Sequence, residues 1–442
     1  MSGMARSLAG RPADPLLPSD RSTAPFPRLR LRDPSGPLLD LPWALPLAAW
    51  PEAELGFRRL PVGPSRHLVR FLGRDGATFA LKELPVELAN REYSVLRQLE
   101  ALGLPAVTAV GIAESPERET AILVTEYLAH SLQYRRLLMR LPAGPGPYRD
   151  RLLDAMAWLL VDLHRSGVYW GDCSLANTLF RRDGDRIQAY LVDAETSEVH
   201  EKLSDGQRAY DLEVLVENVG FGLADLALMQ GGSDDLDDAV AAAESVRSLY
   251  HALWQELTDE PIVSADERFA IRARIRRLND LGFTVDEIEL VPTQDGGRVR
   301  LRVVVTTQRF HVRELERLTG IVALEGQARL LLNDVREYRA WLEWSEKRTV
   351  DERVSAERWL RDVFQPTVRR LVMSIGPDRD PVQAYCDVLE HKWLLSEQAG
   401  RDVGLEAAIQ SYLASGAPAP EAPGGVAALD LDVEGMAADA LG

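Results

Sequence analysis

Short apolar runs bounded by turn residues dominate the early part of the chain, and helical spacing dominates the rest. Four apolar runs of strand length occur at residues 68–72, 78–84, 106–113 and 121–127. The turn signal Arg74-Asp75-Gly76 joins the first two runs and predicts a hairpin. Residues 86–102 predict a helix, because their apolar side chains recur at helical spacing and Gly103 ends the pattern.

Helical patterns follow these strands in the first half of the chain, at residues 131–139, 148–166, 208–229 and 235–257. The second half begins with a predicted helix at 267–281. A hairpin follows, in which the runs 286–291 and 299–306 flank the turn signal Gln294-Asp295-Gly296-Gly297. From His311 to about Leu413 the pattern is helical almost throughout. We therefore expect an α+β chain whose second half is α-rich with one β-hairpin.

The length of 442 residues exceeds what one hydrophobic core usually serves, and it predicts two or three domains. Residues 1–45 are rich in Pro, Arg, Ser and Gly without a sustained period, and they predict a disordered arm. Residues 416–442 hold Ala, Pro, Gly and acidic residues, and they predict a disordered acidic tail. Between these ends we expect two domains, at residues 46–260 and 265–415.

The composition is that of an ordinary globular protein, with 46% hydrophobic and 27% charged residues. The net charge of −17 argues against nucleic-acid binding and against docking on an anionic membrane, since both need a basic surface. No run of eighteen apolar residues occurs, so no membrane insertion is expected. No signal peptide is recognisable, and the two cysteines, Cys173 and Cys386, lie far apart. We therefore expect a cytoplasmic protein without disulfides.

The strongest chemical signal is a loop with Asp-x-x-x-x-Asn spacing, formed by Asp172 and Asn177 and followed by Asp193 after an apolar strand. Phosphoryl transfer needs a carboxylate beside the acceptor hydroxyl and ligands that hold Mg²⁺ on the triphosphate. Asp172 is the expected base, and Asn177 and Asp193 are the expected metal ligands. Aspartate and asparagine are also common turn residues, so the spacing alone is weak. The order of helix, loop, strand and aspartate favours the functional interpretation.

A second signal lies upstream, where the strand Ala80-Leu81-Lys82 contains one lysine and Glu92 follows in the next helix. Glu92 falls on the apolar face of that helix, between Leu88 and Val95. A carboxylate on a buried face needs a cationic partner, and Lys82 is the natural candidate. Their ion pair would direct the ammonium to the ATP phosphates, so both are candidate catalytic residues and Lys82 is also a candidate ATP ligand. Alternatively, both are ordinary residues at the margins of their elements.

Two weaker signals complete the pattern. Asp211, near the start of an apolar helix, is expected to anchor the loop backbone by hydrogen bonds, although an acidic residue in a first helical turn also stabilises the helix itself. The apolar run Ile122 to Leu128 is typical of a strand that leads into the connection between two lobes. Backbone groups from Glu126 to Leu128 would then bind adenine, and an ordinary buried strand is the alternative.

The stretch Trp170 to Leu179 resembles the catalytic loop of the atypical RIO kinases, with Ser174 two residues past the aspartate. It is also similar to the loops of lipopolysaccharide (Kdo/WaaP-type) sugar kinases and of aminoglycoside phosphotransferases. The resemblance covers less than half of the chain and is specific for the superfamily, not for the substrate. It implies a two-lobed protein-kinase-like fold and a phosphotransferase that uses ATP and Mg²⁺.

The second half resembles a C-terminal domain of unknown function in uncharacterised bacterial proteins, familiar from actinobacteria, where it follows a lipopolysaccharide-kinase-like domain. The matching segments are Arg276 to Phe283, Glu325 to Arg329 and Leu389 to Glu397. The resemblance implies no known activity. The charged residues here, among them His391, favour helix-pairing contacts over a metal site. Four tryptophans are expected to be packing residues and not a ligand-binding cluster: Trp341, Trp344, Trp359 and Trp393.

Three features depart from the kinase pattern. No G-x-G-x-x-G motif precedes Lys82, and the segment Leu60 to Arg66 contains one glycine, so fewer backbone amides can approach the phosphates. Trp170 stands where kinases usually place a histidine. The short stretch between Asp193 and Asp211 leaves little room for an activation segment. This favours a small-molecule kinase or an atypical protein kinase.

The leading hypothesis is a kinase that transfers phosphate from ATP, with Mg²⁺, to a hydroxyl of a sugar, another small molecule or a protein serine. The alternative is a nucleotide-binding pseudokinase that acts through a protein partner, since the glycine-poor segment weakens the case for turnover. A RIO-like ATPase switch is a further alternative. The second domain is a candidate surface for substrate, for a protein partner or for the kinase lobe itself, and the sequence leaves these alternatives open.

Overall fold

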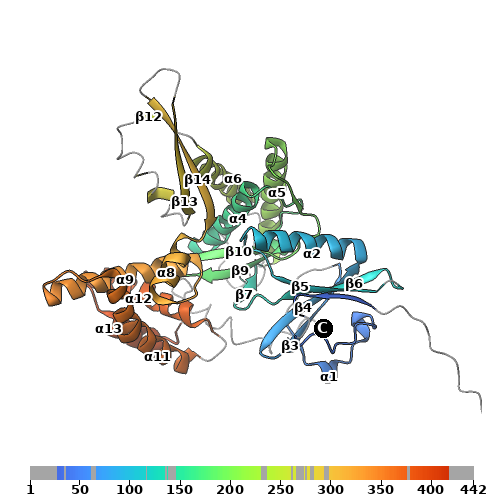
Figure 1. The fold of residues 1–442 in the computed structure, drawn as a ribbon, viewed down its shortest axis with the longest axis horizontal. Helices are drawn as coiled ribbons and strands as arrows, with labels where there is room; N and C mark the ends of the chain where they lie inside the picture. The colour runs from blue at the N-terminus through green and yellow to red at the C-terminus, as the bar shows by residue number, and fades with distance from the viewer. Residues whose placement is uncertain are drawn as a thin grey trace, which may run out of the picture.

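The computed structural model describes residues 27–33, 36–60, 66–115, 117–134, 137, 146–229, 236–259, 262–264, 273, 276–278, 283–292, 298–375 and 379–417. Most of the predicted N-terminal arm, nearly all of the predicted acidic tail and most of the helix predicted at 267–281 lie outside these residues. Figure 1 shows a sheet-rich lobe, a helical lobe and a further group of helices beside the second lobe.

A six-stranded antiparallel sheet forms the first lobe, in the order β1-β5-β6-β4-β3-β2. Its strands are β1 (Arg28–Leu31), β2 (Phe57–Arg58), β3 (Leu68–Arg74), β4 (Ala77–Pro85), β5 (Ala109–Ser115) and β6 (Thr120–Glu126). The predicted hairpin is confirmed, because Arg74 faces Ala77 across the β3–β4 turn. Asp75 and Gly76 at this turn have φ values of 48° and 82°, a left-handed conformation that these residue types tolerate.

The two faces of this sheet are covered by different parts of the chain. Helix α2 (Val86–Ala101) packs on one face with Leu123 of β6, in the same core as the second lobe. The neighbouring side chains Ile122 and Val124 point to the opposite face, where they meet Trp43 and Trp50. This covering segment also holds η1 (Leu47–Ala49) and α1 (Glu52–Leu55).

The predicted disordered arm of residues 1–45 is wrong over its described end. Strand β1 pairs with β5 in register from Arg28 to Leu31, and Leu38, Leu41 and Trp43 are buried. The segment covers the sheet as an irregular, proline-rich loop, so its apolar side chains have no regular spacing for a sequence pattern to detect.

The second lobe is helical, with α4 (Pro147–Arg165), α5 (Asp205–Met229) and α6 (Leu236–Thr258). Between α4 and α5 lie β8 (Val168–Tyr169), η2 (Leu175–Asn177), β9 (Thr178–Asp183), β10 (Arg186–Leu191) and β11 (Glu198–Val199). The helix predicted at 131–139 begins instead as strand β7 (Ser131–Gln133), which pairs with β9. Pairing with β9 thus overrides the helical apolar pattern of this segment.

The second half begins with a three-stranded sheet in the order β12-β14-β13, from β12 (Ile262–Ser264), β13 (Phe283–Pro292) and β14 (Arg298–Gln308). The predicted hairpin is confirmed, and β12 extends it. The helices are α8 (Phe310–Thr319), α9 (Glu325–Glu346), α10 (Glu352–Trp359), α11 (Gln365–Ile375), α12 (Pro381–Ala399) and α13 (Leu405–Ala414). A π-helical turn, η3 (Leu360–Phe364), joins α10 to α11. The α+β class with a kinase-like first part is thus confirmed.

A second core holds these helices together around Trp359, Tyr385 and Tyr412, all fully buried. Trp359 packs as predicted. The other three tryptophans, Trp341, Trp344 and Trp393, are 54%, 78% and 61% exposed, so the prediction for them was wrong. No helix in the described part of the chain is long and apolar enough to cross a membrane.

Candidate active site

Lys82 of β4 lies at the centre of a cluster of carboxylates between the lobes. Its ammonium is 3.0 Å from Glu92 of α2 and 2.9 Å from Asp193, which follows β10. Glu195 lies farther away, at 3.9 Å. The predicted pairing of Lys82 with Glu92 is present, and Glu92 is only 1% exposed, as its place on the apolar face of α2 required.

Burial and charge act in opposite directions on this cluster. Burial by itself lowers the pKa of Lys82, but the carboxylates of Glu92 and Asp193 raise it above its usual value. Burial raises the pKa of Glu92 to about 7, against the opposing influence of the Lys82 ammonium. A buried carboxyl with a pKa near neutrality is typical of functional sites and also occurs in structural ion pairs.

The loop before β9 brings Asp172 and Asn177 together. The Asn177 side-chain amide donates to Asp172 Oδ2 at 2.9 Å and to the Asp172 carbonyl at 3.3 Å. Ser174 Oγ accepts from the backbone N–H of Asn177 at 3.3 Å and thereby caps η2. Gly171 has a φ of 83°, and a Cβ at this position would meet the Thr196 carbonyl oxygen at 3.0 Å. A glycine directly before Asp172 is therefore a requirement of the backbone.

Asp211 anchors this loop, as predicted. Its carboxylate accepts from the backbone N–H of Trp170 at 2.7 Å and of Gly171 at 2.9 Å. His164 Nε2 contacts the same carboxylate at 3.1 Å, and His164 Nδ1 lies 2.7 Å from the Tyr250 hydroxyl. Burial lowers the pKa of His164, although Asp211 opposes this. Trp170 thus contacts Asp211 only through its backbone N–H, and the imidazole that contacts Asp211 belongs to His164.

Sequence reasoning missed this His164 contact and further supports of the loop. Thr196 Oγ1 and Ser197 Oγ both donate to the Trp170 carbonyl, at 2.9 and 3.1 Å. The Asn218 amide of α5 donates to the Cys173 carbonyl at 2.9 Å. A histidine in the helix before the loop was visible in the sequence, but its burial against Asp211 depends on the packing of α4, α5 and α6. The loop backbone is therefore held from two sides.

A cavity of about 380 Å³ joins these groups. Its lining includes Lys82, Glu92, Asp172, Asn177 and Asp193, together with Glu126 and Leu128 from the end of β6 and the connection after it. All seven predicted site residues therefore border one cleft. Its lining also includes Ser174, Glu195 and Thr196, together with Arg66, His67, Val69 and Phe71. The glycine-poor segment lies mostly outside the described residues.

The connection between the lobes has a defined backbone pattern. The Glu126 N–H donates to the Thr108 carbonyl at 2.9 Å, and the Tyr127 N–H donates to the Thr78 carbonyl at 2.9 Å. The Leu128 carbonyl accepts from Ser131 Oγ at 2.6 Å. Glu126, Tyr127 and Leu128 all line the cavity, and the contacts above involve the N–H groups of the first two and the carbonyl of the third.

The donor set suits Mg²⁺. Asp193 and Asn177 offer hard oxygen ligands, and the amide oxygen of Asn177 takes no part in its contact with Asp172. In the described part of the chain, no group of three or more His, Cys, Asp or Glu side chains is arranged to hold a metal ion. A phosphate-bound Mg²⁺ does not need such a cage, since it usually keeps several waters and takes one or two carboxylates plus substrate oxygens.

Two family models match this chain. Residues 72–229 match the lipopolysaccharide kinase (Kdo/WaaP) family, and residues 252–416 match a domain of unknown function (DUF4032). The first match spans β4, the loop and Asp211. The second begins inside α6, although the predicted boundary lies at residues 260–265.

The chain is similar to the lipopolysaccharide core heptose(I) kinase WaaP of Pseudomonas aeruginosa, with 28% identity over 142 residues. The match covers 30% of this chain and 53% of that protein, so the chain spans about half the length of this curated relative. A solved structure, WaaP in complex with acyl carrier protein, aligns with 21% identity over 57% of this chain and 99% of that chain, at a TM-score of 0.34. The resemblance to RIO kinases stays a prediction. Residues 72–229 are thus similar to the lipopolysaccharide kinase (Kdo/WaaP) family, and residues 252–416 match a C-terminal domain of unknown function.

Proposed function

We propose that the protein is an ATP- and Mg²⁺-dependent phosphotransferase that acts on a hydroxyl, with a sugar as the leading acceptor class. The observation behind this proposal is the convergence of Lys82, Glu92, Asp172, Asn177 and Asp193 on one cavity. The match to a lipopolysaccharide kinase family supports a sugar over a protein serine.

Each residue has one role in this proposal. Asp172 orients the acceptor hydroxyl and takes up its proton, and its hydrogen bond to Asn177 fixes the carboxylate. Lys82, held by Glu92, leaves Asp193 and meets the α- and β-phosphates. Asn177 and Asp193 hold Mg²⁺, which neutralises phosphate charge when bound. The Glu126 carbonyl and the Leu128 N–H bind the adenine edge.

The first experiment is calorimetric titration of ATP with and without Mg²⁺, on the wild type and on Asp193→Ala. We expect Mg²⁺-dependent binding that the substitution abolishes. A wild type that does not bind millimolar ATP with Mg²⁺ would contradict the proposal.

The second experiment distinguishes an enzyme from a nucleotide sensor. We expect Asp172→Ala to keep ATP binding and to lose phosphoryl transfer to sugar acceptors by about 10³-fold, the usual scale for loss of a general base. The glycine-poor segment before Lys82 favours the alternative, a pseudokinase that binds nucleotide and signals through a protein partner. If the wild type binds Mg²⁺ and ATP but transfers phosphate to no acceptor and does not hydrolyse ATP, that alternative replaces the proposal.

A further inference from the structure

The two domains meet along a polar contact that we call the seam. One side of the seam is the turn of the β9–β10 hairpin, and the other side is the beginning of α9 and of α12. Its residues are Arg181, Arg182, Asp183, Gly184 and Asp185 on the hairpin, and Gly326, Gln327, Arg329, Asp380, Gln383 and Asp387 on the helices. Figure 1 shows the helical group lying beside this hairpin.

The Gln383 side chain forms hydrogen bonds with the backbone of the hairpin turn. Its side-chain oxygen accepts from the Gly184 N–H at 2.9 Å, and its side-chain nitrogen donates to the Gly184 carbonyl at 2.9 Å. The same nitrogen donates to Asp387 at 2.9 Å. A Cβ on Gly184 would lie 2.9 Å from the backbone of Gly326, so only glycine permits this approach. The turn is therefore fixed in two directions by one side chain.

Asp183 supplies the N-terminal cap of a helix in the other domain. Its two carboxylate oxygens accept from the backbone N–H groups of Gly326 and Gln327, both at 2.8 Å, in the first turn of α9. Burial raises the pKa of Asp183 to about 6, although these two N–H groups oppose the shift. A helix normally takes such a cap from its own preceding residue, but Leu324 occupies that position in α9. The helix end is thus completed by the kinase domain.

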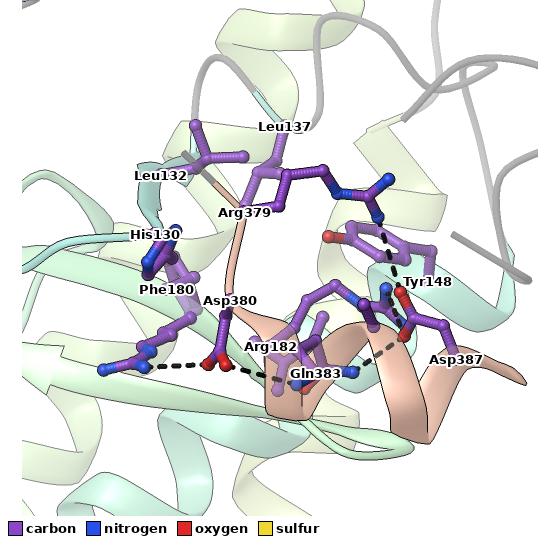
Figure 2. A pocket seen from close by; sticks show the side chains of 13 residues that line it. His130, Leu132, Leu137, Tyr148, Phe180, Arg182, Arg379, Asp380, Gln383 and Asp387 are labelled. Atoms are coloured by element: carbon purple, nitrogen blue, oxygen red, sulfur yellow. Dashed lines mark hydrogen bonds and ion pairs between the residues drawn. The ribbon is translucent and has the colours of Figure 1, made fainter. Parts of the chain in front are cut away.

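Matched ion pairs flank these contacts. Arg329 binds both oxygens of Asp185 at 2.5 and 2.6 Å. Arg181 pairs with Asp380 at 3.0 Å, and Arg182 pairs with Asp387 at 2.8 Å. Figure 2 shows Asp380, Gln383 and Asp387 of the helix side, with Arg182 in contact with Asp387; these residues and Phe180 line a cavity of about 70 Å³. Two of these pairs join a hairpin arginine to a helix carboxylate, and the third joins a helix arginine to a hairpin carboxylate.

The hairpin runs directly from the seam to the cleft. Its two strands pair in unbroken register from Arg186 and Asp183 at the turn to Leu191 and Thr178 at the far end. Asn177 immediately precedes this ladder, and the Val192 N–H donates to the Asn177 carbonyl at 3.1 Å, one residue before Asp193. Six residues of strand span about 20 Å. The continuously paired hairpin therefore has the seam at one end and both proposed metal ligands at the other.

Residues that match the domain of unknown function also pack in the hydrophobic core of the kinase domain, away from the seam. Leu253 and Leu257 of α6 lie within the region that matches the domain of unknown function, yet both are buried in the core of the kinase domain. Leu278, beyond the predicted boundary, is fully buried in the same core. The packing therefore does not divide the chain at residues 260–265.

We propose that the second domain positions the active site: by fixing the hairpin turn, Gln383 and Asp183 set where Asn177 and Asp193 stand in the cleft. This inference rests on the proposed function and gives the domain of unknown function a role in it. These are positioning residues, because they touch neither nucleotide nor acceptor. A displacement of about 1 Å at such ligands can lower turnover about 100-fold.

The test is a charge exchange across the seam in the full-length protein, with Asp185→Arg, Arg329→Asp and the double variant. Calorimetry measures the Mg²⁺ concentration needed for half-maximal ATP binding, and adenosine binding without Mg²⁺ reports the rest of the cleft. We expect each single variant to need about tenfold more Mg²⁺ with unchanged adenosine affinity. The double variant, which restores an ion pair, should return to within about twofold of the wild type.

Asp334→Asn is the matched control for a general loss of stability. Asp334 accepts from Trp359 Nε1 at 2.7 Å and from the Tyr385 hydroxyl at 2.7 Å, and both of these partners belong to the second core. The Asp334→Asn variant should have a lower melting temperature and an unchanged Mg²⁺ requirement.

Gln383→Ala is a second seam variant with no charge reversal, and it should raise the Mg²⁺ requirement as the single exchanges do. Wild-type Mg²⁺ dependence in the seam variants, or an equal shift in Asp334→Asn, would overturn the inference while the proposed function stands. Absence of Mg²⁺-dependent ATP binding in the wild type would overturn both.

Discussion

The cleft and the seam are both rich in charged side chains, but their charges are balanced differently. In the cleft, the carboxylates of Glu92, Asp172, Asp193 and Glu195 gather near Lys82, and the lining also holds Arg66 and His67, of which His67 lies 3.3 Å from Glu195. At the seam, each carboxylate has a matching arginine or pair of backbone N–H groups. The cleft thus has more carboxylates than cations, whereas the seam is closely matched.

Under the proposed function, a bound ligand balances the charge of the cleft, whereas the carboxylates of the seam are paired within the protein. An excess of like charge in a partly buried cavity is unfavourable unless a further group neutralises it, and a divalent cation does this in phosphotransferases. At the seam, the carboxylates are already paired within the protein. Substitutions in the cleft should therefore change binding and turnover directly, whereas those at the seam should lower stability and change Mg²⁺ binding through the hairpin.

The largest effect is expected where the cleft is itself anchored. Asp211→Ala removes the acceptor of the buried Trp170 and Gly171 N–H groups and the partner of His164. Because buried donors lose their acceptor, we expect a loss of about 3 kcal/mol in unfolding free energy and no measurable transfer. Denaturant unfolding and a transfer assay measure the two effects. Glu217→Ala, at an exposed position of the same helix, is the control and should change neither. Retained transfer would contradict the anchoring role.

The next effect compares two helix caps, one supplied between domains and one within a domain. Asp183→Ala leaves the Gly326 and Gln327 N–H groups buried without their acceptor, and we expect a loss of about 2 kcal/mol. Asp351→Ala removes an exposed cap of α10 and should cost about 1 kcal/mol. Urea unfolding of both variants tests the order. Equal losses would show that the cap between domains stabilises no more than an ordinary one.

A pH dependence should appear in the cleft. Because the pKa of Glu92 is raised to about 7, protonation below that pH removes the charge that holds Lys82, and wild-type ATP affinity should fall between pH 8 and 6. Glu92→Gln should bind ATP about tenfold more weakly at pH 8, with little change between pH 8 and 6. A pH-dependent affinity that persists in the variant would assign the titration to another group.

The same carboxyl has an opposite effect on folding. Its folded-state pKa lies above the ordinary value of 4.5, so folding favours the protonated form. Its contribution to stability is present below about pH 4.5 and is lost as the pH rises through about 7. The wild type should therefore gain stability relative to Glu92→Gln between pH 8 and pH 5, as melting temperatures would show.

The smallest effect is expected outside both regions. Trp344→Ser alters a side chain that is 78% exposed on α9, so the unfolding free energy should change by less than about 0.5 kcal/mol. Mg²⁺-dependent ATP binding should also stay unchanged. A larger loss of stability would mean that this tryptophan packs against something in solution.

Much of the cleft was predictable because its chemistry is local. Asp172 and Asn177 lie on one short loop, and the apolar spacing of α2 alone placed Glu92 on a buried face. The regular helices and hairpins followed from the same kind of pattern. The covering segment around Trp43 and strand β7 escaped prediction, because neither has a period of its own and both take their shape from the sheet they contact.

The sequence by itself determined the residue types of the cleft, their order and the long regular elements, since these depend on neighbours a few positions apart. Only the tertiary structure decided that His164 meets Asp211, that Leu278 belongs to the first core, and that Asp183 caps a helix 143 residues later. These contacts join polar or apolar side chains that have no distinctive local spacing. Their partners are fixed by how whole helices and strands pack, and this packing minimises buried unpaired polar groups over the entire chain.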